Sequence, residues 1–359
     1  MRSRLSRFKY LAPRLGLALG SVYLTLLAVE VGLRLQAKPQ GAIPHGLLQA
    51  DKAAGFALVP GYHGQFDDGF VRGDIHINSL GYRDDEPHPD AISRVLLLGD
   101  SFTFGYLLDQ TETIDKWVER LEPGLEVCNL GVSAYNLPQQ LEPLRRWTLP
   151  AQQVVYLFFC NDLLTNSMDH YNVVEGYLVP RSRPDGTLYS ENELQQEIAR
   201  KTQPNDLERL SPRTMLLAQV RQIVQRAAAR LDRISDRDRD WLEDVKVKTK
   251  LRNLVIPCAV DYTLQMRALA VERAMNFLIV IIPALDEVRA AKYRHATAQY
   301  VAGLRAAGFD VIELLPRLST ADYWRHDVHF NPQGAKKAAE AISQALKQSR
   351  ETSPIRKGE

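Results

Sequence analysis

Short, largely apolar runs constrain the fold of this chain more than any other feature. They lie at residues 94–98, 125–130, 154–159, 277–282 and 310–314. Compact runs of this length are typical of buried parallel strands. Helical patterns follow them at residues 111–121, 138–147, 264–274, 287–307 and 333–347. This alternation predicts an α/β protein whose parallel sheet is covered by helices on both faces.

Several parts of the chain fall outside the alternation. Residues 36–60 are rich in proline and glycine and indicate a linker, and residues 61–83 indicate short strands and turns. Residues 163–260 are polar and basic and predict a mostly helical insertion that acts as a lid. The predicted organisation is a linker and N-terminal extension at 36–93, a main domain at 94–348 and a flexible tail at 349–359.

The N-terminus predicts a membrane anchor. Residues 15–33 are apolar apart from Glu30, and a helix of this length spans about 28 Å, close to the hydrocarbon thickness of a bilayer. The five basic residues before this run are Arg2, Arg4, Arg7, Lys9 and Arg14. We therefore expect a cytoplasmic segment at 1–14, a single transmembrane helix at 15–35 and a periplasmic main domain. A cleaved signal peptide lacks a convincing cleavage site, and a buried core helix leaves the basic residues unexplained.

Composition and missing motifs exclude several classes of protein. With 45 basic against 43 acidic residues, the net charge of +2 gives no field that recruits nucleic acid. Three cysteines without C-x-x-C spacing argue against a disulfide framework, so we expect Cys128 and Cys160 to be core residues, a bridge between them being the alternative. Nucleotide-binding and His-Glu-x-x-His motifs do not occur, and His326 with His329 lacks further ligands, so we expect no cofactor and no metal.

Candidate catalytic residues stand at the carboxyl ends of the predicted strands, which meet at one edge of a parallel sheet. Ser101, Gly131 and Asn161 each follow a strand, and Asp327 and His329 precede the last helix. Each of these segments alone is common at turns and helix caps. Their joint occurrence, in this order, predicts one catalytic constellation.

The chemistry of these residues is coherent. His329 is a base that can take the proton of the Ser101 hydroxyl, and Asp327 is near enough in sequence to fix the tautomer of His329. A tetrahedral oxyanion needs preorganised donors. We expect these to be the backbone N–H groups of Ser101 and Gly131 and the side-chain amide of Asn161.

These segments resemble the four blocks of the SGNH/GDSL hydrolase family. Residues 99–101 (Gly-Asp-Ser) match the first block, Gly131 the second, Asn161 the third, and Asp327 with His329 the last. The resemblance implies a flavodoxin-like α/β/α three-layer sheet, the SGNH hydrolase fold, and serine ester chemistry. It covers residues 94–165 and 275–347 and leaves the insertion unexplained. More loosely, the anchor and residues 78–83 resemble exported members among polysaccharide-modifying proteins.

The chain departs from the family pattern at two positions. The third block usually carries glycine two residues before its asparagine, where this chain has Phe159. The last block commonly has aspartate three residues before the histidine, where this chain has His326. The spacing of Asp327 and His329 resembles that of alginate-acetylation relatives within the family. The orienting acid is therefore less firmly assigned than the nucleophile, and His326 is a competitor for His329.

The predicted activity is serine-dependent hydrolysis of acyl esters, chiefly O-acetyl esters of a polysaccharide, through an acyl-enzyme. The first alternative is an O-acetyltransferase that uses the same triad to modify an exopolysaccharide or cell-wall glycan. The second is a non-catalytic glycan-binding subunit, and lipase or thioesterase activity is a further option. The expected partners are an acylated small-molecule or polysaccharide substrate, the membrane and polysaccharide-synthesis proteins.

Overall fold

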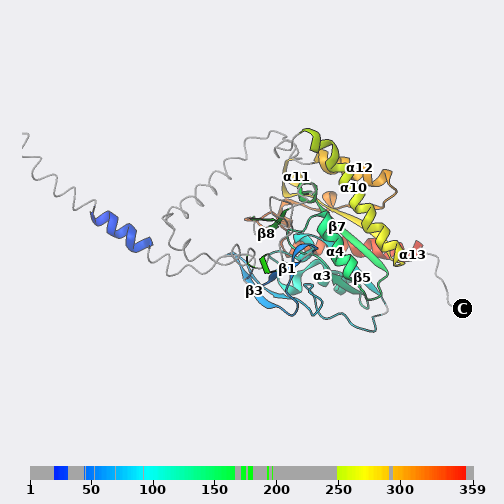
Figure 1. The fold of residues 1–359 in the computed structure, drawn as a ribbon, viewed down its shortest axis with the longest axis horizontal. Helices are drawn as coiled ribbons and strands as arrows, with labels where there is room; N and C mark the ends of the chain where they lie inside the picture. The colour runs from blue at the N-terminus through cyan, green and yellow to red at the C-terminus, as the bar shows by residue number, and fades with distance from the viewer. Residues whose placement is uncertain are drawn as a thin grey trace, which may run out of the picture. The chain divides into compact units, whose positions relative to one another are not determined.

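The computed structural model describes part of the chain in detail. The described residues are 20–30, 44–165 apart from 45, 52, 69 and 92, then 171–174, 177–180, 192–193, 196, 249–290 and 294–352. The chain divides into two compact units, residues 1–40 with 204–236 and residues 41–203 with 237–359. All elements described below belong to the second unit unless stated otherwise (Figure 1).

In the first unit, only residues 20–30 are described, and they are helical. Apolar side chains are exposed along this helix, including Val22, Tyr23 and Leu24. Among the residues that the structure describes, no helix combines the length and apolar character needed to cross a membrane. The rest of the transmembrane helix predicted at 15–35 lies outside the described residues.

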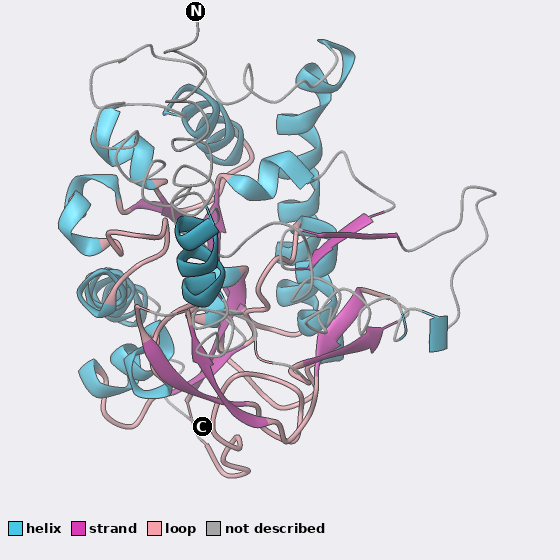
Figure 2. Cartoon of the chain, turned by 90° about the vertical axis from the view of Figure 1, so that its left-hand side faces the viewer, coloured by secondary structure: helices cyan, strands magenta, loops and turns pink. Residues whose placement is uncertain are grey.

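A five-stranded parallel sheet forms the centre of the second unit (Figure 2). Its strands are β5 (Arg94–Gly99), β6 (Glu126–Asn129), β7 (Gln153–Phe159), β10 (Asn276–Ile282) and β11 (Val311–Glu313). Every residue of β5 and β7 is buried, which explains why their sequences are continuously apolar rather than alternating. The order β11-β10-β7-β5-β6 reads 2-1-3-4-5 from the other edge, the flavodoxin-like order that the sequence predicted.

Helices follow the strands as predicted, with changes in their bounds. They are α2 (Ser101–Phe104), η1 (Gln110–Glu112), α3 (Ile114–Leu121), α4 (Leu137–Arg146), α5 (Asn161–Thr165), α10 (Thr249–Glu272), α11 (Leu285–Ala290), α12 (Arg294–Ala306), η3 (Leu315–Arg317), η4 (Thr320–Asp322) and α13 (Pro332–Thr352). Helix α3 packs on α13, while α10 packs on α4 and α12. The helix expected at 264–274 begins fifteen residues earlier, within the predicted insertion, because α10 continues through Pro257. The helix expected at 287–307 is described as α11 and α12.

The linker prediction for residues 36–60 is wrong where the structure describes them. Strands β1 (Leu48–Asp51) and β2 (Gly55–Leu58) pair antiparallel, as do β3 (His63–Asp67) and β4 (Arg72–His76). Their apolar side chains form a second buried cluster that also takes in Phe104 and Val132 from the main domain. The proline and glycine residues therefore shape turns between strands, and residues 46–83 pack against the loops that follow β5 and β6.

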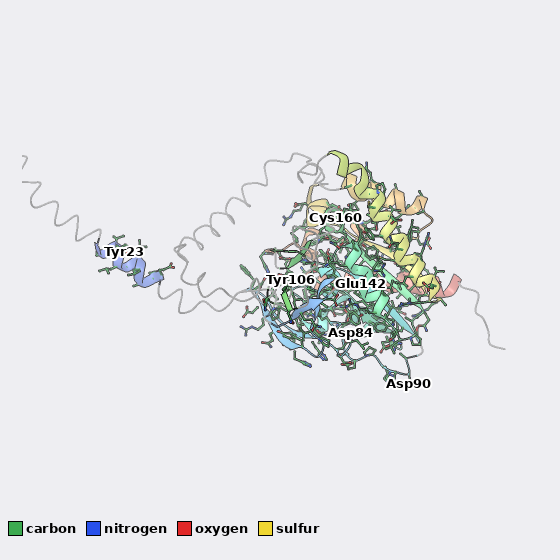
Figure 3. The ribbon with its side chains drawn as sticks, in the orientation of Figure 1. Tyr23, Asp84, Asp90, Tyr106, Glu142 and Cys160 are labelled. Atoms are coloured by element: carbon green, nitrogen blue, oxygen red, sulfur yellow. The ribbon has the colours of Figure 1, made fainter. Side chains whose placement is uncertain are left out.

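The insertion is described only at its two ends. Strands β8 (Tyr171–Val174) and β9 (Tyr177–Pro180) form an antiparallel hairpin that the prediction of a mostly helical segment did not include. Residues 163–165 of α5, the helical residues 192–193 and 196, and the start of α10 are also described, and the rest of the predicted lid lies outside the described residues. Cys128 and Cys160 are buried free thiols, so they are core residues and the alternative bridge is not formed (Figure 3).

Candidate active site

Ser101 stands at the first position of α2, directly after β5. The side chain of Asp100 caps this helix by accepting a hydrogen bond from the N–H of Phe102 at 3.0 Å. The helix ends after one turn because Gly105 adopts the left-handed conformation, with φ of 82°. Ser101 is only 8% exposed. The strand and both caps therefore fix the backbone of the predicted nucleophile at the carboxyl edge of the sheet.

Ser101, His329 and Asp327 are brought together in the order that the sequence predicted. His329 Nε2 lies 2.8 Å from Ser101 Oγ, and His329 Nδ1 lies 2.5 Å from Asp327 Oδ1. Asp327 Oδ1 also accepts the backbone N–H of His329 at 2.9 Å. Asp327 stands two residues before the histidine and contacts its Nδ1, so the triad does not need an aspartate three residues before the histidine.

The environment of Asp327 favours its carboxylate form. Burial raises the pKa of Asp327, but the hydrogen bond and charge of His329 outweigh burial and hold the pKa below its ordinary value of 3.8. A carboxylate can only accept from Nδ1, so Nδ1 carries the proton and Nε2 of the neutral ring is left to accept the Ser101 hydroxyl. This is the arrangement in which an imidazole can act as a general base.

Two aromatic rings flank His329, and the sequence motifs did not indicate them. The centroid of Phe102 lies 4.9 Å from that of His329, and the centroid of Tyr106 lies 4.7 Å from it. Both rings come from the α2 segment, and Figure 3 labels Tyr106. Phe102 also packs on Phe159, 4.5 Å away, at the position where the family usually has glycine. This departure therefore adds a packing partner behind the nucleophile and leaves the triad geometry closed.

Gly131 lies against the backbone of α2. A Cβ at this position would come within 2.4 Å of the Phe104 nitrogen, so only glycine allows the approach. The Gly131 N–H donates to Asn129 Oδ1 at 3.0 Å. This predicted oxyanion donor therefore has a protein acceptor in the structure, and its catalytic role stays a prediction.

Asn161 begins α5, directly beyond β7 and Cys160, and its side-chain amide donates to the Asp100 carboxylate. Burial raises the pKa of Asp100, and this hydrogen bond opposes the rise. The neighbouring Asp162 is buried beneath the site and accepts from Gln140 at 2.9 Å and from the Tyr156 hydroxyl at 3.1 Å. Asn161 thus stands at the expected edge of the sheet, and its oxyanion role also stays a prediction.

Arg83 supports the nucleophile from outside the main domain. Its guanidinium is fully buried and donates five hydrogen bonds, using the complete donor set of the side chain. The acceptors are the carbonyls of Phe104, Gly105, Leu108 and Asp74 and the side chain of Gln110. Arg83 therefore ties the last carbonyls of the one-turn helix α2 to β4. The sequence motifs did not indicate this role of Arg83, because it depends on burial of the charged group among loop residues, and the sequence alone does not show burial.

Asp84 supports Gly131 in a similar way. Its carboxyl group accepts the N–H of Asn129 at 2.9 Å and lies 2.7 Å from Lys116 Nζ. The Asn129 side chain donates to Thr103 O at 2.8 Å while it accepts from Gly131. Figure 3 shows Asp84 inside the unit and Asp90 at its periphery, although they are near each other in sequence. Arg83 and Asp84, which are adjacent residues of the N-terminal extension, thus hold the segments around Ser101 and Gly131 in place.

His326 does not compete with His329. Its Nε2 lies 2.9 Å from Asp68 Oδ2 in the β3–β4 connection, and its ring stacks on Phe70. Among the described contacts, His329 is the histidine that reaches Ser101. The structure therefore places His329 beside Ser101 and His326 beside Asp68, and the role of His329 as the base stays a prediction.

Residues 280–358 match the model of a family described as an SGNH hydrolase-like domain, acetyltransferase AlgX. The matched segment includes Asp327, His329 and the whole of α13. The match confirms the resemblance to SGNH/GDSL hydrolases over this segment and supports an enzyme of this type, an esterase or an acyltransferase. Among curated proteins, no sequence matches the chain.

Solved structures of GDSL-type proteins are similar to the chain at low sequence identity. A lipolytic protein of the G-D-S-L family from Veillonella parvula is 12% identical, with a TM-score of 0.39 over 71% of this chain and 99% of its own. A GDSL-like lipase from Bacteroides thetaiotaomicron is 13% identical, with a TM-score of 0.39 over 74% and 92%. An aryl esterase from M. smegmatis is 12% identical, with a TM-score of 0.37 over 71% and 99%.

Proposed function

We propose that the chain cleaves O-acyl esters, chiefly O-acetyl esters of a polysaccharide, with Ser101 as nucleophile. The observation that carries this proposal is the continuous contact from Ser101 Oγ through His329 to Asp327, with distances of 2.8 and 2.5 Å. A serine hydroxyl is a weak nucleophile without an adjacent base, and these contacts supply one whose orientation is fixed.

The reaction divides into two steps. As Ser101 Oγ attacks the ester carbonyl carbon, its proton passes to His329 Nε2, and the carbonyl oxygen becomes an oxyanion. When the intermediate collapses, His329 returns the proton to the departing alcohol, and the acyl group stays on Ser101. An acceptor hydroxyl then attacks the acyl-enzyme and gives its proton to His329, which passes this proton to Ser101 Oγ as the bond between the acyl group and Ser101 breaks. Asp327 stabilises the imidazolium in both steps, and the first-turn N–H of Ser101 has no acceptor within its own helix and can face the oxyanion.

The acceptor distinguishes two forms of this function. With water as acceptor, the enzyme is a deacetylase, which needs no second binding site. With a sugar hydroxyl as acceptor, it is an O-acetyltransferase. The family description of an acetyltransferase over residues 280–358 favours this second form. The alternative of a non-catalytic glycan-binding subunit is based on the two departures from the family pattern, Phe159 and the position of Asp327. Both residues are compatible with a triad whose three members are in contact.

The decisive test is hydrolysis of p-nitrophenyl acetate by the full-length chain. We expect Ser101→Ala to lower kcat by at least about 10³-fold. Ser79→Ala is the matched control, because the Ser79 hydroxyl donates to Glu86 in the extension, away from the triad. Equal rates for the wild type and Ser101→Ala would show that the ester chemistry does not depend on this serine.

A second assay separates hydrolase from transferase. The wild type is incubated with an acetyl donor and with acetylated or unacetylated oligosaccharide, and the acetyl groups are followed by mass spectrometry. Release of free acetate supports the deacetylase, whereas new sugar esters support the transferase. Ser101→Ala should abolish either product.

We also propose that the chain is a single-pass inner-membrane protein with a periplasmic catalytic domain. The basic residues before residue 15 and the apolar run at 15–33 support this placement. Reporters fused to each terminus test the topology: activity of a periplasm-specific reporter at the C-terminus is the expected result. A cytoplasmic C-terminus would contradict the proposal.

A further inference from the structure

The tip of the β3–β4 hairpin lies against the loop that carries Asp327 and His329. Phe70, from the hairpin tip, stacks on the ring of His326 with centroids 4.4 Å apart and planes inclined by 24°. His326 immediately precedes Asp327 and also contacts Trp324, whose ring centroid lies 5.8 Å away. Segments more than 250 residues apart in sequence thus form an aromatic surface next to the triad.

Hydrogen bonds fix this surface on its hairpin side. Asp68 Oδ1 accepts the N–H groups of Phe70 at 2.9 Å and Val71 at 2.8 Å, which closes a tight turn. The other oxygen of Asp68 lies 2.9 Å from His326 Nε2. The Asp68 carboxylate therefore fixes the positions of the stacked rings of Phe70 and His326, so the surface is formed in the absence of a ligand.

The exposure of this surface is unusual for the molecule. Outside the helix at 20–30, the large apolar side chains that are strongly exposed among the described residues are Phe70, Leu80, Val271 and Val328. Phe70, in the ring stack, is 57% exposed, and Val328, two residues after His326 in the sequence, is 51% exposed. Exposed apolar groups that gather at one place commonly mark a binding surface.

We propose that Phe70, supported by His326, is a stacking platform for one pyranose ring of the glycan whose ester reaches Ser101. This inference rests on the proposed function. A pyranose offers an apolar face of C–H groups and a rim of hydroxyls, which suits an open aromatic ring with a carboxylate and an imidazole at its edge. The position beside Asp327 would hold a sugar next to the ester that is cleaved or formed.

The test compares two esters in the full-length chain: p-nitrophenyl acetate, which has no sugar, and O-acetylated hexaoses of β-1,4-linked glucose or mannuronate. We expect Phe70→Ala to lower the kcat/KM of the hexaose relative to that of p-nitrophenyl acetate by about tenfold, mainly through KM. Phe70→Trp keeps a stacking face and should restore the ratio. Val271→Ala is the matched control, because Val271 is 64% exposed on α10.

Binding provides a readout that needs no turnover. The ring of Trp324 contacts that of His326, with centroids 5.8 Å apart, so tryptophan fluorescence can follow titration with the unacetylated hexaoses. Weaker binding by Phe70→Ala than by the wild type supports the platform. Absence of p-nitrophenyl acetate hydrolysis would contradict only the proposed function and would leave this binding result valid. The inference is overturned if the wild type binds neither hexaose, if Phe70→Ala leaves the ratio unchanged, or if both esters lose the same factor.

Discussion

The two halves of the triad are held in different ways. Ser101 is buried, sits between a fully buried strand and a capped helical turn, and is backed by the five hydrogen bonds of Arg83. Asp327 and His329 lie in a loop of bends before α13, with the exposed Val328 between them. The contacts of that loop include the hydrogen bond from the N–H of Trp324 to the carbonyl of His329 and the ring contacts of His329 with Phe102 and Tyr106.

Because of this difference, substitutions on the two sides should affect the stability of the fold and the rate of the reaction differently. On the nucleophile side, the groups that position Ser101 are buried polar groups, so removing one leaves partners unsatisfied and weakens the fold. On the base side, the groups that act in proton transfer are partly exposed, so changing them alters the reaction more than the free energy of unfolding. Variants on the two sides should therefore give different combinations of kcat and stability.

The largest effect is expected for Asp327→Asn on the base side. An amide at this position can donate to Nδ1 and favour the wrong tautomer of His329, so kcat for p-nitrophenyl acetate should fall by about 10³–10⁴-fold. The free energy of unfolding should change by about 1 kcal/mol or less, since the group is partly exposed. Both quantities come from steady-state kinetics and urea unfolding of the same preparation. A large loss of stability with a small loss of rate would reverse the assignment of this loop.

Arg83→Met tests the nucleophile side. Removing the guanidinium leaves buried carbonyls of α2 and its connection without donors, and we expect a loss of about 3–5 kcal/mol in the free energy of unfolding. The kcat of the protein that remains folded should fall about tenfold, because the end of α2 is no longer fixed. The control is Arg72→Met, whose exposed pair with Asp67 should contribute about 0.5 kcal/mol or less. Equal stabilities of these two variants would contradict the buried support.

The same comparison explains what the sequence could predict. The buried strands and the residues at their ends follow from apolar runs and local motifs, whereas the flavodoxin-like order of the strands was implied by the family resemblance. The structure brings Ser101, His329 and Asp327 together accordingly. Residues 46–60 were taken for a linker because β1 and β2 are only four residues long each and surrounded by glycine and proline. Short strands of this kind gain stability from tertiary packing, which a local pattern does not contain.

The supporting residues were missed for a related reason. Arg83 and Asp84 look like ordinary surface charges in sequence, and only the folded chain shows that they contact groups far along the chain, such as Gly105 and Asn129. The sequence likewise does not indicate a role for Phe70 and His326, because only the structure shows that their rings stack and that the extension contacts the loop of Asp327 and His329. Local motifs therefore predicted the three residues that the structure brings into contact, whereas the groups that position them depend on contacts distant in sequence.

The last predictions concern pH, and they have opposite signs on the two sides. Burial and the nearby Asp115 raise the pKa of Asp84 from 3.8 to about 8 despite Lys116. Between about pH 4 and 8 the folded state therefore keeps a proton that the unfolded state releases, so this group makes stability fall as pH rises. The pKa of Asp327 is lowered, so below about pH 3.8 the unfolded state binds a proton that the folded state lacks, and stability falls as pH drops.

Urea unfolding of three proteins between pH 3 and 8 measures these contributions. Relative to the wild type, Asp84→Asn should flatten the decline in unfolding free energy between about pH 4 and 8, and Asp327→Asn should flatten only the acid limb. The absolute stability of Asp84→Asn also changes, because Lys116 loses a partner, so the slope with pH is the quantity to compare. If both variants changed the same limb, the two carboxyl groups would share one kind of environment, and the contrast between a buried nucleophile side and an open base side would not hold.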